Sequence, residues 1–189
     1  MKITKDYPGL TKAKNGDYIL NGDLISDEGI EIELCASIFV SRSIKARYGI
    51  EAKCGIKAGE SIQAGWDITA GYSIKAGNSI IAGYSIKAGN SIKAGNSIKA
   101  GFSIKAGGCI AAGWGIEAGW DVNAGNGIVS GWGIEAGTYI DCGKRIFAGT
   151  SVLADADTCD KTIKCAELRN GTVAYGDLII TKQEVPHED

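Results

Sequence analysis

The chain has 189 residues, of which 44% are apolar and 22% are charged, and its formal net charge is −2. This length is that of one domain with a substantial buried core. The 28 glycines accompany only 2 prolines, which excludes a proline-rich disordered chain, and the small net charge indicates no class of charged partner.

The N-terminal sequence MKITKDYPGLTKAKNGDY lacks the apolar run of a signal peptide. No segment approaches the roughly 18 apolar residues that are needed to span a membrane. The six cysteines are irregularly spaced and form no Cys-x-x-Cys pair. We therefore expect a soluble cytoplasmic protein with free thiols.

Residues 1–29 precede the regular repeat and are predicted to form an N-terminal cap. Their last part, ILNGDLI at 19–25, keeps two aliphatic residues six positions apart with Gly-Asp between them. The open ends of a stacked solenoid expose unpaired strands, and atypical terminal sequences of this kind are typical of capping coils.

Residues 30–155 are predicted to form the body of the protein. From Ile38 to Val152 every sixth residue is Ile or Val, which makes twenty consecutive hexads, and Ala stands two positions later in most of them. In Ser73-Ile74-Lys75-Ala76, period-2 alternation places Ile and Ala inside and leaves Ser and Lys in water. Gly77-Asn78 is then expected to turn the chain, with the glycine at positive φ.

Residues 156–189 are predicted to form a C-terminal cap and a tail. The segment VAYGDLI at 173–179 repeats the pattern of the N-terminal cap, with aliphatic residues six positions apart and Gly-Asp at the corner. The charged tail begins at Lys182 and contains the single histidine, His187.

The residue after each corner glycine indicates how many hexads form one coil. Five positions in succession, each 18 residues after the last, hold aromatic side chains: Tyr48, Trp66, Tyr84, Phe102 and Trp120. Like side chains stack along one edge if three hexads complete a coil. The predicted fold is therefore all-β, a three-sided parallel β-helix solenoid of about seven 18-residue coils, each about 4.8 Å from the next, with atypical capping coils.

These repeats resemble those of hexapeptide-repeat parallel β-helices over residues 30–155. The left-handed members of that family place a large aliphatic residue just before the corner, whereas Ala-Gly-x-x-Ile-x places the small residue there. The resemblance implies left-handed winding, with a right-handed prism, as in bactofilin filaments, as the alternative. The near-perfect IKAG repeats also resemble those of phage and prophage proteins.

The resemblance carries a prediction about catalysis. Many members of the family are acyltransferases that use a histidine general base, and some are carbonic anhydrases that hold zinc with three histidines. This chain has one histidine, in the tail, and no loop interrupts its hexads to build a substrate cleft. We therefore expect no enzyme activity, no cofactor, no metal and no small-molecule substrate, with a hexapeptide-repeat acyltransferase as the least favoured alternative.

Three sets of outward residues are candidate contact sites. The first is the aromatic edge with two tryptophans on a neighbouring edge, for which coil-on-coil stacking is the alternative role: Tyr48, Trp66, Tyr84, Phe102, Trp120, Trp114 and Trp132. The second is an apolar self-association face: Ala111, Val129 and Phe147. The third is a basic face, for which a solvated surface is the alternative: Lys57, Lys75, Lys93, Lys87 and Lys105.

We predict a non-catalytic, protein-binding β-helix that forms a homodimer and binds a protein or nucleoprotein partner. The resemblance to phage proteins implies an inhibitor of a host defence complex, similar to an anti-CRISPR protein and acting in the host cytoplasm. The alternative is a structural scaffold or bactofilin-like filament protein. A charge of +7 over residues 42–105 and −5 over residues 106–160 would suit its head-to-tail contacts.

Overall fold

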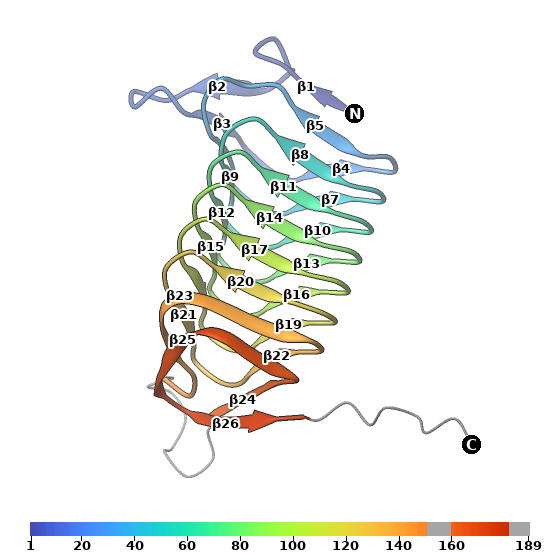
Figure 1. Ribbon diagram of the computed structural model, residues 1–189. Helices are drawn as coiled ribbons and strands as arrows, with labels where there is room; N and C mark the ends of the chain where they lie inside the picture. The colour runs from blue at the N-terminus through green and yellow to red at the C-terminus, as the bar shows by residue number, and fades with distance from the viewer. Residues whose placement is uncertain (151–159, 182–189) are drawn as a thin grey trace, which may run out of the picture.

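The protein is a rod of stacked β-coils (Figure 1). The computed structural model describes residues 1–150 and 160–181, and every regular element within them is a strand. These residues include no helix that is long and apolar enough to cross a membrane. The strands pair in parallel from coil to coil, which confirms the predicted all-β parallel solenoid.

The strands form three columns, and each column is one face of the prism. Face 1 consists of β3 (Tyr18–Leu20), β6 (Ile38–Val40), β9 (Ile56–Ala58), β12 (Ile74–Ala76), β15 (Ile92–Ala94), β18 (Ile110–Ala112), β21 (Ile128–Ser130) and the second parts of β23 (Tyr139–Phe147) and β25 (Glu167–Tyr175). Face 2 consists of β4 (Leu24–Ser26), β7 (Ile44–Ala46), β10 (Ile62–Ala64), β13 (Ile80–Ala82), β16 (Ile98–Ala100), β19 (Ile116–Ala118), β22 (Ile134–Ala136), β24 (Thr162–Cys165) and β26 (Asp177–Ile180).

Face 3 consists of β1 (Lys2–Ile3), β5 (Ile30–Ile32), β8 (Ile50–Ala52), β11 (Ile68–Ala70), β14 (Ile86–Ala88), β17 (Ile104–Ala106), β20 (Val122–Ala124) and the first parts of β23 and β25. The two long strands β23 and β25 run around the corner between faces 3 and 1. β2 (Leu10–Lys12) pairs antiparallel with β3 at the N-terminal end.

The 18-residue register holds through the middle of the rod and changes at both ends. Ile38 pairs with Ile56, whereas the first coil is two residues longer, since Leu24 pairs with Ile44. The stack includes strands on both sides of residues 30–155. Val152 begins the last predicted hexad and lies outside the described residues. On face 2, Ile134 pairs with Ile163 and not with a residue 18 positions further along the chain.

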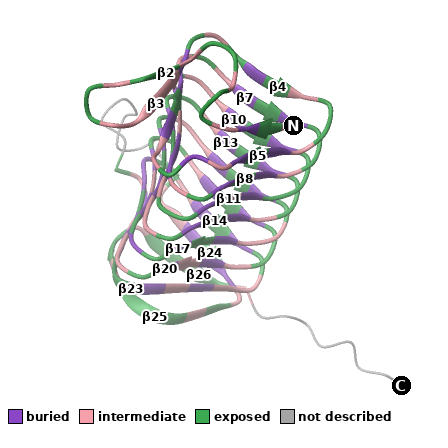
Figure 2. Cartoon of the chain, turned by 90° about the horizontal axis from the view of Figure 1, so that it is seen from above, coloured by how far each residue is buried: buried purple, intermediate pink, exposed green. Residues whose placement is uncertain are grey.

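The core is a continuous column of aliphatic side chains, because each three-residue strand from β5 to β22 buries its first and third residues (Figure 2). Ile74 and Ala76 are buried while Lys75 is exposed, as period-2 alternation predicts. Three alanine positions of the described hexads hold other residues: Val40, Ser130 and Cys142. Buried Ser130 places its hydroxyl against the carbonyl oxygens of Trp114 and Gly133, and Cys142 is likewise buried.

The corner glycines serve a purpose other than the predicted one. Gly77 does not adopt positive φ, nor does any other corner glycine of the middle coils, so that prediction was wrong. The corner backbone is hydrogen-bonded to the preceding coil instead: the Gly83 N–H donates to the Ala64 carbonyl at 3.1 Å. A Cβ on Gly83 would lie well inside 3.0 Å of the Gly65 carbonyl oxygen, so a side chain would overlap the backbone.

Replacing one corner glycine tests this explanation. Gly83→Ala is expected to destabilise the fold by about 1–3 kcal/mol, the usual cost of overpacking a close-packed site. Gly115→Ala is the matched control, because its Cβ would meet only the Gly133 carbonyl oxygen at an ordinary 3.6 Å. Urea denaturation measures both, and equal stability of the two variants would contradict the close-approach explanation.

Candidate protein-binding surfaces

The predicted aromatic column lies on the edge between faces 2 and 3, and it consists of two separate stacks. Tyr84, Phe102 and Trp120 stack in sequence, with ring centroids 5.3 Å and 4.5 Å apart. Tyr48 and Trp66 form a tilted pair at 5.1 Å. Among the described residues no ring contact joins Trp66 to Tyr84. The rings in each stack contact one another from coil to coil, which supports a stabilising role between coils.

Trp114 and Trp132 lie on a different edge, between faces 1 and 2. Their rings stack at 6.0 Å with an interplanar angle of 18°, and they are 54% and 40% exposed. The strands β18 and β21 that precede them are regular three-residue strands, so the corner presents both rings outward. These two tryptophans are therefore large apolar groups held rigidly in water.

A hollow of about 440 Å³ extends from this tryptophan pair over the adjoining part of face 2. Its charged lining consists of one residue each from β16, β19, β22 and β24 and of one residue just before β24: Lys99, Glu117, Glu135, Lys164 and Asp160. Exposed aromatic rings beside charged groups are the combination found at energetically important positions of protein interfaces. We refer to Trp114, Trp132 and these charged residues as the tryptophan hollow.

The charges of the tryptophan hollow form an ordered ladder. Glu117 and Glu135 lie opposite each other on β19 and β22, so two like charges are neighbours. The Lys99 ammonium contacts the Glu117 carboxylate at 2.8 Å, and the Lys164 ammonium contacts the Glu135 carboxylate at 2.9 Å. All four side chains are about half exposed. Because exposed ion pairs contribute little to stability, contacts with a partner can replace these two ion pairs.

Lys164 was missed by the sequence analysis. The regular register would place residue 153 beside Glu135, whereas β24 places Lys164 there, 29 residues further along the chain. The chain between Glu135 and Lys164 includes residues 151–159, which lie outside the described residues. No periodic signal in the sequence indicates this shift.

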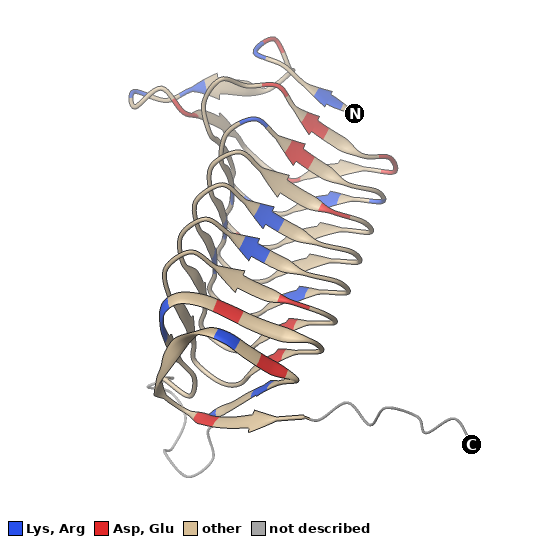
Figure 3. Ribbon diagram, in the orientation of Figure 1, with Lys and Arg blue, Asp and Glu red and all other residues tan. Residues whose placement is uncertain are grey.

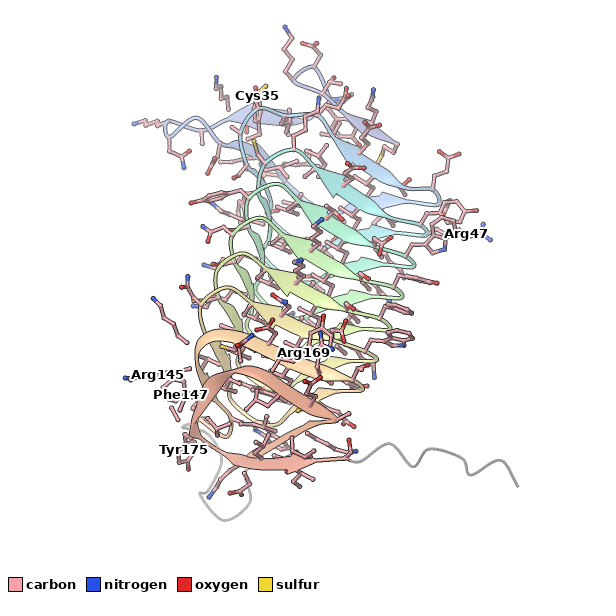
Figure 4. All side chains as sticks on the ribbon, viewed as in Figure 1. Cys35, Arg47, Arg145, Phe147, Arg169 and Tyr175 are labelled. Atoms are coloured by element: carbon pink, nitrogen blue, oxygen red, sulfur yellow. The ribbon has the colours of Figure 1, made fainter. Side chains whose placement is uncertain are left out.

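The predicted self-association face is a continuous row on face 1. Ala111 lies opposite Val129, and Val129 lies opposite Phe147. The row continues to Tyr175 on β25, which the sequence analysis did not include, and Figure 4 shows Phe147 and Tyr175 close together near the C-terminal end. Val129 and Tyr175 are exposed, and Ala111 and Phe147 are half-buried.

The predicted basic face divides between two faces of the prism. Lys57, Lys75 and Lys93 are successive on face 1, and Lys87 lies opposite Lys105 on face 3. Figure 3 shows the basic bands of β14 and β17 between acidic bands on β8 and β23. Lys57 contacts Asp17 at 3.3 Å, the one ion pair of this set within the described residues. These lysines flank the edge between faces 3 and 1 and do not form one flat surface.

The buried thiols are poorly suited to nucleophilic chemistry. Burial raises the pKa of the Cys142 and Cys165 thiols above its ordinary value, so both are protonated near neutral pH. Within residues 1–150 and 160–181, no three His, Cys, Asp or Glu side chains are grouped closely enough to hold a metal ion.

Comparison of the chain with protein-family models, with curated proteins and with solved structures finds no match.

The stabilising role of the aromatic stack can be tested at its middle ring. Phe102→Ala removes contacts to both Tyr84 and Trp120, and each aromatic pair is worth about 0.5–1.5 kcal/mol, so we expect a loss of about 1–3 kcal/mol in unfolding free energy. Tyr72→Ala is the control, since Tyr72 is exposed and makes no ring contact with the described residues. Thermal or urea denaturation that shows equal losses for both variants would rule out this role.

Proposed function

We propose that this chain is a non-catalytic, protein-binding β-helix that acts by occupying the surface of a protein or nucleoprotein complex. The observation that carries the proposal is the tryptophan hollow. Trp114 and Trp132 are held by ring stacking and remain 54% and 40% exposed, although water is an unfavourable environment for such large apolar rings. Rigid aromatic groups of this kind lose little conformational entropy when a partner covers them.

The chemistry of the hollow favours a partner segment that carries arginine beside an apolar side chain. A guanidinium group can stack on an exposed indole ring and hydrogen-bond to a carboxylate. Glu117 and Glu135 lie side by side on the strands next to the tryptophans, so one arginine can reach both kinds of group. Its binding would relieve the repulsion between the two carboxylates.

The biological setting is a proposal that rests on resemblance. The IKAG-type repeats resemble those of phage and prophage proteins and of left-handed hexapeptide-repeat β-helices. A phage protein of this design would act in the host cytoplasm as an inhibitor of a defence complex, as anti-CRISPR proteins do. The rigid rod is suited to that role, because a preformed surface can block a complex without chemistry.

Capture from host lysate tests the role of the tryptophan pair. The double variant Trp114→Ala/Trp132→Ala is expected to lose at least tenfold in affinity for a defined complex that wild type retains, since truncated interface tryptophans commonly cost about 2 kcal/mol or more. Tyr72→Ala removes an exposed aromatic ring from another edge and should bind as wild type does. Circular dichroism checks that each variant is folded. Undiminished capture by the double variant would refute the assignment of the binding site.

The apolar row on face 1 is proposed as a side-by-side contact between copies. Val129→Glu places a charge in the middle of the row, between Ala111 and Phe147, and is expected to lower the mass of the assembly in light scattering. Ile81→Glu is the matched control, because Ile81 is equally exposed, at 38%, on face 2. An unchanged mass for Val129→Glu would exclude the row as a contact between copies.

A further inference from the structure

Face 3 carries its outward charges in two successive bands along the rod (Figure 3). The acidic band consists of Glu31 and Glu51, which lie opposite each other on β5 and β8. The basic band consists of Lys87 and Lys105, which lie opposite each other on β14 and β17. Thr69 on β11 separates the bands, with Glu51 on one side and Lys87 on the other. Read from either end, the same order of charges returns with its signs reversed.

The four charged groups of these bands have no ion-pair partner within the described residues. All four side chains are exposed, and none of them belongs to an ion pair of the described chain. Thr69 keeps Glu51 and Lys87 two coil spacings apart, roughly 10 Å, which is too far for an ion pair. Like charges are neighbours within each band instead, and such neighbours repel. Each band therefore lacks counter-charges that a partner can supply.

A hollow of about 620 Å³ lies over the acidic band. Its lining includes Glu31 and Glu51 and the rings of Tyr48 and Trp66, which stand on the edge between faces 2 and 3. These two rings are tilted by 54°, whereas the other ring pairs of the described residues are stacked at 18° or less. They are 41% and 59% exposed. Carboxylates beside open aromatic rings suit an ammonium group and its methylene stem.

We propose that face 3 binds face 3 of a second copy in an antiparallel, two-fold symmetric dimer. A two-fold axis that runs along β11 reverses the order of the coils, so β8 lies over the partner's β14 and β5 lies over the partner's β17. Glu51 then meets the partner's Lys87, and Glu31 meets the partner's Lys105. Symmetry repeats both ion pairs on the other side of the axis, and the lysines of each copy enter the hollow of the other.

The order of charges selects this arrangement over the neighbouring ones. A two-fold axis parallel to the rods would place Glu51 over the partner's Glu51 and Lys87 over the partner's Lys87. Antiparallel rods shifted by one coil would place Glu31 over the partner's Asn123, which follows the basic band on β20, so one of the two ion pairs is lost. Complementary charges fix the register of a contact, and repulsion excludes the alternatives.

Two further charges lie close to the proposed contact. The Lys2 ammonium on β1 contacts the Glu33 carboxylate at 3.1 Å, so it is paired within its own chain. Asp67 lies next to the axis, and its carboxylate accepts a hydrogen bond from the Ser85 N–H at 2.9 Å. In the dimer the partner's Lys87 lies one coil spacing from Asp67. Both charges are therefore compensated, and the contact depends on the two bands.

The contact leaves the surfaces described above free. In a three-sided prism face 3 is opposite the edge between faces 1 and 2, which carries the tryptophan hollow, and the apolar row lies on face 1. The dimer is therefore independent of the proposed function and of any contact through the apolar row. It would present one tryptophan hollow on each of its two outer sides.

Light scattering on full-length charge-reversal variants tests the dimer. Glu51→Lys and Lys87→Glu are each expected to halve the mass of the assembly, because like charges then meet across the axis. The fold should tolerate both, since each reversal removes a repulsion with Glu31 or Lys105 inside its own chain, and circular dichroism checks this. Lys45→Glu is the matched control: it reverses an exposed lysine on face 2 and should keep the wild-type mass.

Mixing the two variants tests the two-fold geometry itself. In a heterodimer of Glu51→Lys with Lys87→Glu, each reversed group faces a group of opposite charge on the other copy. An equimolar mixture should therefore regain the wild-type mass, although neither variant reaches it alone.

Salt distinguishes this contact from an apolar one. At about 1 M salt the screening length is about 3 Å, so the wild-type mass should fall, whereas an apolar contact would persist. Wild type that stays at the 19.7 kDa of one chain in dilute buffer would overturn the proposal. So would single variants of wild-type mass, a mixture that fails to reassemble, or an assembly whose mass salt leaves unchanged.

Discussion

Hydrogen bonding between the backbones of successive coils, continued through the corners, is the constraint on which the structure depends. The Gly77 N–H donates to the Ala58 carbonyl at 3.1 Å, and the Asn78 N–H donates to the Glu60 carbonyl at 2.9 Å. Corners that approach this closely leave no room for a Cβ on the glycine. The glycine lets the corner stack as tightly as the strand, and the middle coils keep their 18-residue length because their corners are alike.

Tight stacking turns each repeat position into a column of neighbours along the rod. Inward columns of Ile and Ala make the core, and every outward residue lies directly opposite its counterpart in the next coil. The residues of one outward column therefore lie next to one another and together determine the chemistry of that part of the surface. Like charges become neighbours at Lys87 and Lys105, aromatic rings stack at Phe102 and Trp120, and the carboxylates of Glu117 and Glu135 meet beside the tryptophans.

A solenoid must end its stack, and this one ends it in two different ways. The N-terminal residues cover the first coil, whereas the described C-terminal residues leave Leu178 and Ile180 exposed.

Local periodicity alone was sufficient to predict the body of the rod. Alternation of Ile and Ala defines the inward face of each strand, and recurrence of aromatic residues at 18-residue steps defines the coil, because both are properties of neighbouring positions in the sequence. Tertiary structure was needed wherever distant segments meet. The reason for Gly83 is a carbonyl one coil away, Lys164 reaches Glu135 only after an irregular segment, and Leu178 is exposed because nothing described lies beyond it. Each depends on what lies across a coil boundary, which a short repeat does not encode.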